Sequence, residues 1–188
     1  MWLQALFSLD DFQKVLGSLT PLRIGLAEDD TDRFLYVGKP TAVDLVPGQG
    51  IRISTHAKLR WQVSKIHVPI RLRTVTLLLK PSIAKRNKKD VLAFTLTLED
   101  ADLNALPGVL DRKVVKYVNE ALQKESAQLV WSFMDTLDFD FKLPKMLAPA
   151  EKFLLASQWG EVRVTKEGIA LAVSFKTGIQ KAKATAVR

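Results

Sequence analysis

The chain of 188 residues contains no cysteine and only two histidines, His56 and His67. The absence of cysteine excludes disulfide bonds, thiolate metal sites and a cysteine nucleophile. The two histidines lack the spacing of zinc ligands, and both fall on the polar side of predicted strands. The sequence therefore predicts no metal site and no cofactor.

Long apolar runs are also missing. The longest stretches without a charged residue, Met1–Leu9 and Ser126–Met134, are nine residues long, whereas a membrane-spanning helix needs about 18. Met1–Leu9 has no positive n-region and no cleavage site, which makes it a poor signal peptide. We therefore expect a cytoplasmic protein, peripheral to a membrane if it docks there. A periplasmic location would apply if an export signal had been removed.

Recognised catalytic motifs are absent. The sequence has no nucleophile elbow, no P-loop and no dinucleotide fingerprint. Asp138 and Asp140 share a strand face, but we expect them to be solvated opposite Phe139 and Phe141. The prediction is that the protein is not an enzyme. A Ser-His-Asp set of residues distant in sequence stays open, which leaves an esterase as the third alternative.

Acidic residues are missing from one part of the chain. The net charge is +8, and residues 51–89 carry 11 basic residues and no acidic one. One contiguous surface of the fold should therefore be positive. The basic residues alternate with apolar ones, as in LRWQVSKIHVPIRLR (Leu59–Arg73), so they should share one face of long strands.

The pattern of the first half predicts a short helix followed by long strands. Ser8 is a helix cap, with Asp10 and Asp11 in the first turn. Short strands are expected at 33–37 and 41–46. From Ile51 to Val63 the alternation spans thirteen residues, on the order of 43 Å. The alternation changes parity at Ser64-Lys65, which indicates a tight hairpin or bulge, and again at Arg73-Thr74.

The second half predicts a return strand at 92–98, a long helix, a long strand and a closing hairpin. The helix is expected from about Leu106 to Ala127, roughly 33 Å long. Apolar residues then alternate through 129–143, with Asp135 as the only interruption. The hairpin joins 161–164 to 169–175. We expect one domain over residues 1–188, with flexible ends at 1–7 and 177–188.

This order of elements resembles the TULIP superfamily of tubular lipid-binding proteins, including its small bacterial members. The resemblance is carried by Gly50–Trp61, Val68–Pro81, Asp102–Leu122 and Gly160–Phe175. It implies an α+β fold in which a long curved antiparallel sheet rolls around a long helix of the C-terminal half, with a shorter N-terminal helix. The lipobox cysteine of the bacterial lipoproteins is absent.

The resemblance implies non-enzymatic binding of a lipid or other apolar molecule between sheet and helices, by a carrier or sensor. The predicted ligand-lining residues lie on the apolar faces of the strands and of the long helix. They are Ile51, Ile53, Leu59, Trp61, Val68, Ile70, Leu77, Phe94, Leu96, Leu110, Val114, Val118, Leu122, Phe139, Phe141, Leu171, Val173 and Phe175. The same residues could equally pack as a filled core, because native interiors leave few voids.

The basic face has three interpretations. The first-ranked interpretation is a solvated outer sheet that lysine and arginine protect from aggregation. Docking on an anionic membrane ranks a close second. Nucleic acid ranks third, since the basic side shows no aromatic stacking platform.

The alternative function is a structural or adaptor protein that binds an acidic protein or nucleic acid through this face. The surface-docking residues are Arg52, Lys58, Arg60, Arg71, Arg73, Lys85, Arg86, Lys88 and Lys89. The oligomeric state is left open.

Overall fold

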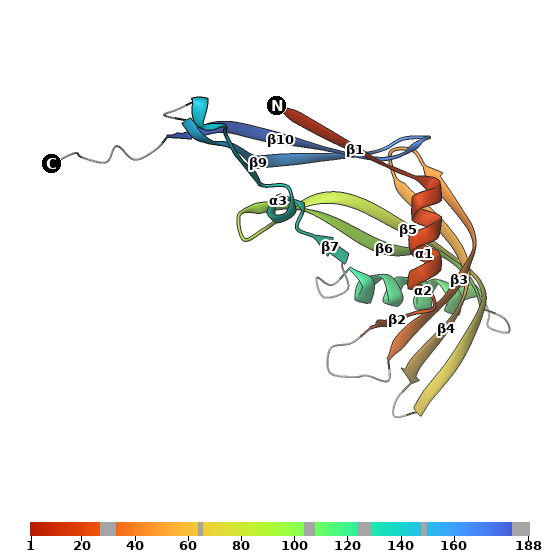
Figure 1. The fold of residues 1–188 in the computed structure, drawn as a ribbon. Helices are drawn as coiled ribbons and strands as arrows, with labels where there is room; N and C mark the ends of the chain where they lie inside the picture. The colour runs from red at the N-terminus through yellow and green to blue at the C-terminus, as the bar shows by residue number, and fades with distance from the viewer. Residues whose placement is uncertain (27–32, 64–65, 104–107, 124–128, 148–149, 182–188) are drawn as a thin grey trace.

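The computed structural model forms two antiparallel sheets with helices packed against them (Figure 1). It describes residues 1–26, 33–63, 66–103, 108–123, 129–147 and 150–181. Within 61–63, 66–73, 102–103 and 108–114 it describes the backbone and, of the side chains, only that of Leu72. The elements in chain order are β1 (Trp2–Ser8), α1 (Leu9–Leu19), β2 (Leu22–Gly25), β3 (Phe34–Val46), β4 (Gly50–Val63), β5 (Ile66–Arg86), β6 (Lys89–Leu103), α2 (Gly108–Leu122), β7 (Leu129–Trp131), α3 (Phe133–Thr136), β8 (Phe139–Lys142), the 3-10 turn η2 (Lys145–Leu147), β9 (Ala150–Val164) and β10 (Gly168–Lys181).

The larger sheet has six strands in the order β2-β3-β4-β5-β6-β7 and curls strongly (Figure 1). Its centre is built from the long strands β4, β5 and β6. Ile51, Ile53 and Leu59 of β4 are buried on the concave face, while Lys58 is exposed on the convex face. The predicted alternation of β4 is therefore confirmed, and its cause is the two-residue period of a strand.

Two breaks in the alternation of the sheet lie where the sequence predicts them. β4 and β5 form a hairpin, because Val63 pairs with Ile66. Further along β5 the register shifts between Leu72 and Val75, where three steps on β5 match two steps on β6. The extra residue at 73–74 is a bulge, which keeps both Leu72 and Val75 on the buried face.

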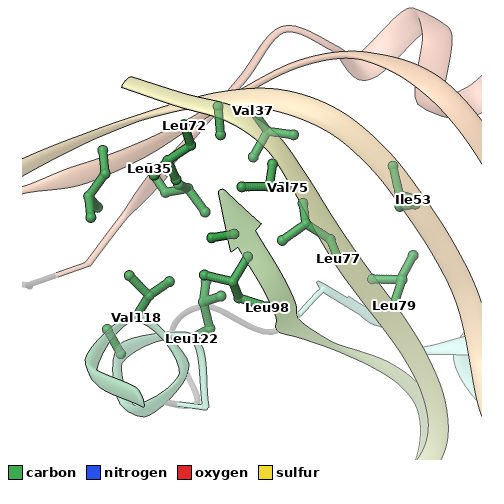
Figure 2. Close-up of a cluster of buried hydrophobic side chains, with 14 of the residues drawn as sticks. Leu35, Val37, Ile53, Leu72, Val75, Leu77, Leu79, Leu98, Val118 and Leu122 are labelled. Atoms are coloured by element: carbon green, nitrogen blue, oxygen red, sulfur yellow. The ribbon is translucent and has the colours of Figure 1, made fainter. Parts of the chain in front are cut away.

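The main core lies on the concave face of the six-stranded sheet. Figure 2 shows Val118 and Leu122 pointing from α2 toward Leu98 of β6. Val118 is fully buried, and it belongs to the same apolar cluster as Leu35, Leu72 and Val75. Ile53, Leu77 and Leu79 lie farther along the strands in Figure 2, away from α2. The helix therefore covers only part of the concave face.

Asn119 fastens α2 to β6. The Leu98 backbone N–H donates to Asn119 Oδ1 at 2.7 Å, and Asn119 Nδ2 donates to the Leu98 carbonyl at 2.9 Å. β7 pairs with β6 only at Leu92–Phe94, so it does not reach Leu98. The amide side chain thus takes the place of a neighbouring strand at this point of the edge.

The second sheet has four strands in the order β1-β10-β9-β8 and extends beyond the first (Figure 1). Its inner face buries Leu171, Val173 and Phe175 of β10 in a second apolar cluster with Leu92 and Phe133. Gly160 of β9 lies directly against the Phe133 ring. The junction therefore depends on close contact between a glycine and a buried aromatic ring.

A buried acid adds a polar link between the sheets. Asp90, which begins the buried part of β6, accepts from the Gly160 backbone N–H at 3.2 Å and from Lys85 Nζ at 3.1 Å. Asp90 is 6% exposed. Burial of a carboxylate is tolerated only where partners of this kind replace water.

The structure is thus sheet-dominated α+β with a curled antiparallel sheet, as the sequence predicts, but its details differ in three places. α2 spans fifteen residues, about 22 Å at 1.5 Å per residue. Of the rest of the helix expected from Leu106 to Ala127, Gln123 is a turn, and residues 106–107 and 124–127 lie outside the described residues. β3 is one strand with register shifts around Pro40 rather than two short strands. The ends are also strands, since β1 covers most of 1–7 and β10 continues to Lys181.

The long strand predicted over 129–143 is wrong. The chain there forms β7, α3 and β8, and the two strands belong to different sheets. Phe133 and Met134 are adjacent in sequence and both are buried, which a strand with alternating faces does not allow. The helical turn of α3 brings both side chains into the junction between the sheets.

Substitution of Gly160 by alanine should destabilise the fold. The added Cβ would lie 2.5 Å from Phe133 Cζ, so the ring must shift within a packed cluster. We expect a loss of about 1–3 kcal/mol in the free energy of unfolding, measured by urea denaturation. Gly17→Ala is the control, because its added Cβ would meet no atom within 4 Å beyond its own helix backbone, and alanine favours the exposed helix α1. Equal stability of the two variants would contradict the role of the contact.

Substitution of Asn119 by leucine should also destabilise the fold. Both polar groups of Leu98 would lose their partner at a half-buried position, which costs about 1–3 kcal/mol. Gln123→Leu, at an exposed position just after α2, should change the free energy of unfolding by less than about 0.5 kcal/mol. Denaturant titration of both variants measures the difference, and a small effect at Asn119 would show that water replaces its amide.

Candidate functional site

A cavity of about 290 Å³ lies on the concave face of the six-stranded sheet, at the end that α2 does not cover. Its walls come from α1, β2 and the strands β3 to β7. The lining residues are Leu16, Leu19, Thr20, Leu22, Arg23, Ile24, Gly25, Val37, Pro40, Ile53, Leu77, Leu79, Phe94, Leu96 and Leu129. Most of these side chains are aliphatic, so the cavity is apolar.

The sheet side of the cavity follows from strand register. Ile53 pairs with Leu77, and Leu79 pairs with Leu96, which places these four side chains on one face of three neighbouring strands. Residues two apart on a strand point to the same side, so Leu77 and Leu79 lie next to each other. The concave wall is therefore a direct result of the alternating sequence.

The opposite side is formed by α1 and β2. α1 contributes Leu16 and Leu19, which are three residues apart and therefore share a helix face. β2 contributes Leu22 and Ile24, which share a strand face. The apolar side of α1 thus contacts the cavity as well as the core, where Phe12 and Leu16 are half-buried.

A capping box fixes the start of α1. The Asp11 backbone N–H donates to Ser8 Oγ at 3.2 Å, and the Ser8 backbone N–H donates to the Asp11 carboxylate at 3.1 Å. The Ser8 hydroxyl also donates to this carboxylate at 2.7 Å, and these hydrogen bonds lower the pKa of Asp11. The cap predicted at Ser8 is confirmed. It sets where the wall-forming helix begins.

The cavity opens to solvent between α1, β2 and β7. Leu19, Leu22 and Leu129 contribute to the lining and are also exposed. Such apolar side chains at the edge of an apolar cavity are unfavourable in water, and covering them is favourable by about 25 cal/mol per Å². The mouth is therefore suited to an apolar molecule.

Polar groups of the lining are engaged elsewhere. The Thr20 hydroxyl donates to the Leu16 carbonyl at 2.7 Å. Among the described residues of the lining, Arg23 alone is charged, and its guanidinium lies 4.1 Å from the centre of the Phe34 ring. Arg23 pairs with Tyr36 across the strands, and Tyr36 pairs with the exposed Lys58. Residues paired in this way share one face of the sheet, so the Arg23 side chain lies on the convex face.

The predicted ligand-lining residues divide into several groups. Ile53, Leu77, Phe94 and Leu96 line the cavity. The other described ones do not: Ile51, Leu59, Val118 and Leu122 are packed in the main core, and Leu171, Val173 and Phe175 in the second cluster, whereas Phe139 and Phe141 are exposed on β8. The side chains of Trp61, Val68, Ile70, Leu110 and Val114 lie outside the described part of the structure.

The sequence did not assign the α1 and β2 residues to a site. A helical stripe such as Phe12, Leu16 and Leu19 indicates burial, but it does not indicate against which part of the sheet. Leu22 and Ile24 show the alternation of a short strand, which could have been recognised. Leu129 is the first residue of β7, and only the tertiary structure brings it opposite α1.

Three residues of the predicted docking face, Arg52, Lys85 and Lys89, are paired with acidic residues of the fold. Arg52 Nε donates to Glu99 at 2.7 Å, which raises the pKa of the guanidinium. Lys89 pairs with Asp135, which raises the pKa of its ammonium group, and Lys85 pairs with Asp90. Glu99 is the extra residue of a bulge in β6, so its position could not be predicted from alternation.

The rest of the convex face is basic and partly aromatic. Lys58 Nζ lies 5.9 Å from the centre of the Tyr36 ring, and Arg60 pairs with Phe34 across the strands. Aromatic residues of β3 therefore lie among the basic residues of this face, which the pattern of residues 51–89 alone does not indicate. Arg86 and Lys88 lie near the β5–β6 turn, while the side chains of Arg71 and Arg73 lie outside the described part.

Other classes of site find no support in the described residues. No group of three or more potential metal ligands gathers there. His56 is exposed, and the side chain of His67 lies outside the described part. Asp138 accepts from the Ser157 backbone N–H and hydroxyl, and Asp140 pairs with Lys152, so both carboxylates support the β8–β9 region. Within the described segments, no helix is long and apolar enough to cross a membrane.

Comparisons with models of protein families, with curated proteins and with solved structures find no match for this chain. The cavity and the surfaces around it are therefore the basis for a functional assignment.

Loss of the α1 cap should loosen the cavity wall. Ser8→Ala removes the two hydrogen bonds of the Ser8 hydroxyl, one accepted from the Asp11 backbone N–H and one donated to the Asp11 carboxylate, and leaves the Ser8 backbone N–H bonded to that carboxylate. It should reduce the free energy of unfolding by about 1 kcal/mol. Because the pKa of Asp11 is lowered in the fold, its contribution is present above the ordinary value of 3.8 and is lost as the pH falls. Thermal unfolding between pH 7 and pH 3 measures this dependence.

The control is Ser18→Ala on the exposed side of the same helix, where the hydroxyl donates only to the Val15 carbonyl. This variant should retain the pH dependence of the wild type, whereas Ser8→Ala should weaken it. Identical pH profiles for Ser8→Ala and the wild type would show that the cap does not contribute.

Proposed function

We propose that this protein binds a lipid or another apolar small molecule, without catalysis, in the cavity between α1, β2 and the curled sheet. The observation that carries the proposal is an apolar cavity with an exposed aliphatic mouth, formed by Leu19, Leu22 and Leu129. Native interiors rarely contain voids much larger than a water molecule. A cavity of about 290 Å³ is far above that size.

The volume constrains the ligand. Small-molecule sites commonly measure about 300–1,000 Å³, so this cavity is at the lower end of the range. It suits one acyl chain or a compact apolar molecule rather than a whole two-chain lipid. The polar end of an amphiphile would remain at the mouth, in contact with water.

The binding energy would come from burial. The ligand contacts would be aliphatic groups of Ile53, Leu77, Leu79 and Leu96, together with the α1 and β2 side chains. Apolar contact is non-directional, so such a site accepts molecules of similar shape and does not select one headgroup. A carrier or a sensor of apolar molecules can use a site of this kind.

The resemblance to the TULIP superfamily is part of this proposal. It is supported by the curled antiparallel sheet and by helices on its concave side (Figure 1). The long helix expected to cover the ligand on the sheet would correspond to α2, but the cavity lies beside α1. In this protein we therefore assign the ligand to the α1 side of the concave face.

The second candidate is an adaptor that uses the convex basic face. It is favoured by the row of Arg23, Tyr36 and Lys58 across β2, β3 and β4, in which cations lie beside aromatic rings. Such a surface could bind an acidic protein or a nucleic acid, with affinity that falls steeply as salt is raised. Binding in the cavity would depend little on salt, which separates the two candidates.

Obstruction of the cavity should abolish ligand uptake. Leu96→Trp places an indole in the concave wall, whereas Thr97→Trp places it on the convex face, because Thr97 pairs with Leu78. We expect binding of a fluorescent fatty acid to weaken about tenfold or more in Leu96→Trp and to remain unchanged in Thr97→Trp. Fluorescence titration measures both, with circular dichroism to confirm folding.

Native mass spectrometry with organic extraction identifies a ligand that copurifies with the protein. A folded Leu96→Trp variant that binds the probe as tightly as the wild type would overturn the cavity assignment. A protein that carries no ligand and takes up neither fatty acids nor other lipids would favour the adaptor.

A further inference from the structure

The far end of the four-stranded sheet forms a separate surface, distant from the cavity. We define the sheet tip as β8, residues 143–144, η2 and the paired ends of β9 and β10 (150–157 and 175–181). Figure 1 shows this end projecting away from α1, α2 and the curled sheet. The inner face of the sheet tip is the continuation of the face on which Val173 and Phe175 are buried, closer to the curled sheet.

The inner face of the sheet tip is apolar and uncovered. Cross-strand pairing aligns Phe141, Phe153 and Ile179 in one row, and Phe139 with Leu155 in the next. Ile179 is 61% exposed and Phe141 is 51% exposed. At the outer end, η2 presents Met146, which is 88% exposed, and Leu147. Apolar side chains of this size are costly to leave in water, which indicates an interaction surface.

The opposite face and the rim of the sheet tip are basic. The tip contains five lysines and two acidic residues, which leaves a surplus of three positive charges. Lys152 pairs with Asp140 at 2.6 Å, which lowers the pKa of the carboxyl and raises that of the ammonium. In the part of the chain that the structure describes, the remaining four lysines are exposed and form no ion pair within 4.0 Å: Lys142, Lys145, Lys176 and Lys181.

This combination fits an anionic lipid surface. An amphipathic element with an apolar side and a lysine-rich side lies in the membrane interface, with its apolar side chains among the acyl chains. The lysine stems extend along the apolar layer and keep their ammonium groups at the lipid phosphates. Each lysine also gains from the negative surface potential of anionic lipids.

Protein partners fit the sheet tip less well. Lysine is depleted at protein interfaces, whereas the sheet tip carries four exposed lysines on its opposite face and rim. A symmetric contact with a second copy would bring two positive tips together, which is electrostatically unfavourable. The charge therefore distinguishes a membrane from self-association.

We propose that the sheet tip docks this protein on anionic membranes, with Met146, Leu147 and Phe141 inserted and Lys142 and Lys145 at the headgroups. This surface differs from the basic convex face, where Arg52, Lys85 and Lys89 are paired within the fold. Docking at the tip does not depend on what the cavity binds, so the two proposals are tested separately.

Vesicle flotation tests the docking directly. The wild type should bind vesicles of two parts phosphatidylcholine to one part phosphatidylglycerol, should bind vesicles of phosphatidylcholine alone far more weakly, and should lose affinity as salt rises. The variant Met146→Ser/Leu147→Ser should bind about tenfold more weakly or worse. Lys142→Glu/Lys145→Glu should lose roughly fivefold or more for each lysine.

Two control variants match these changes elsewhere on the molecule. Val15→Ser removes an apolar side chain that is 51% exposed on α1, comparable with Leu147 at 52%. Lys58→Glu reverses a charge on the convex face. Both should bind the anionic vesicles as the wild type does. All variants alter exposed positions, and circular dichroism checks that they fold.

Three results would overturn the proposal. One is equal binding to neutral and anionic vesicles, or to neither. The second is loss of binding in Lys58→Glu with the tip variants unaffected, which would assign docking to the convex face. The third is a wild-type dimer that the tip variants convert to a monomer in sedimentation velocity, with no vesicle binding.

Uptake of the fluorescent fatty acid without vesicles should be unchanged in the tip variants, which separates failure of docking from failure of the cavity.

Discussion

The concave face of the curled sheet has to be removed from water, and the rest of the structure depends on that constraint. β4, β5 and β6 place every second side chain on this face, and most of them are aliphatic. These three central strands cannot cover their own inner face, so other elements must do so. α2 and the four-stranded sheet cover one part, while α1 and β2 span another.

The two ways of covering the face have different consequences. Where α2 lies on β6, Val118 and Leu122 reach the sheet directly, and Asn119 completes the backbone hydrogen bonds of Leu98. That region is filled. Where α1 and β2 span the sheet, Leu16 and Ile24 contact the core, but a space of about 290 Å³ remains. The cavity thus results from how the helices are distributed over the sheet.

The junction of the two sheets determines which surfaces stay open. Phe133 packs on Gly160, and Asp90 bonds to the same glycine, so β9 is fixed against β6 at this point. Beyond it, β8, β9 and β10 continue without a covering layer (Figure 1). The apolar inner face of the sheet is buried up to Phe175 and exposed at Ile179. One amphipathic pattern therefore serves a core at one end and an exposed surface at the other.

Local patterns in the sequence predicted the local structure well. The alternation of β4, the hairpin between β4 and β5, the bulge before Val75 and the cap at Ser8 are each decided by neighbouring residues, and each is present. The strand predicted through 129–143 is wrong, because alternation alone does not distinguish a strand from short elements joined by a helical turn. Only the packing of Phe133 and Met134 in the sheet junction decides that region.

The candidate site shows the same division. The sequence determined that Ile53, Leu77, Phe94 and Leu96 face inward, because side chains alternate along a strand. It also determined that Leu16 and Leu19 share a helix face. It could not determine that α1 rather than α2 lies beside those strand residues, or that Val118 is packed while Leu96 borders a cavity. Those outcomes depend on which distant elements cover which part of the sheet, and that is decided only when all apolar faces compete for burial in the tertiary structure.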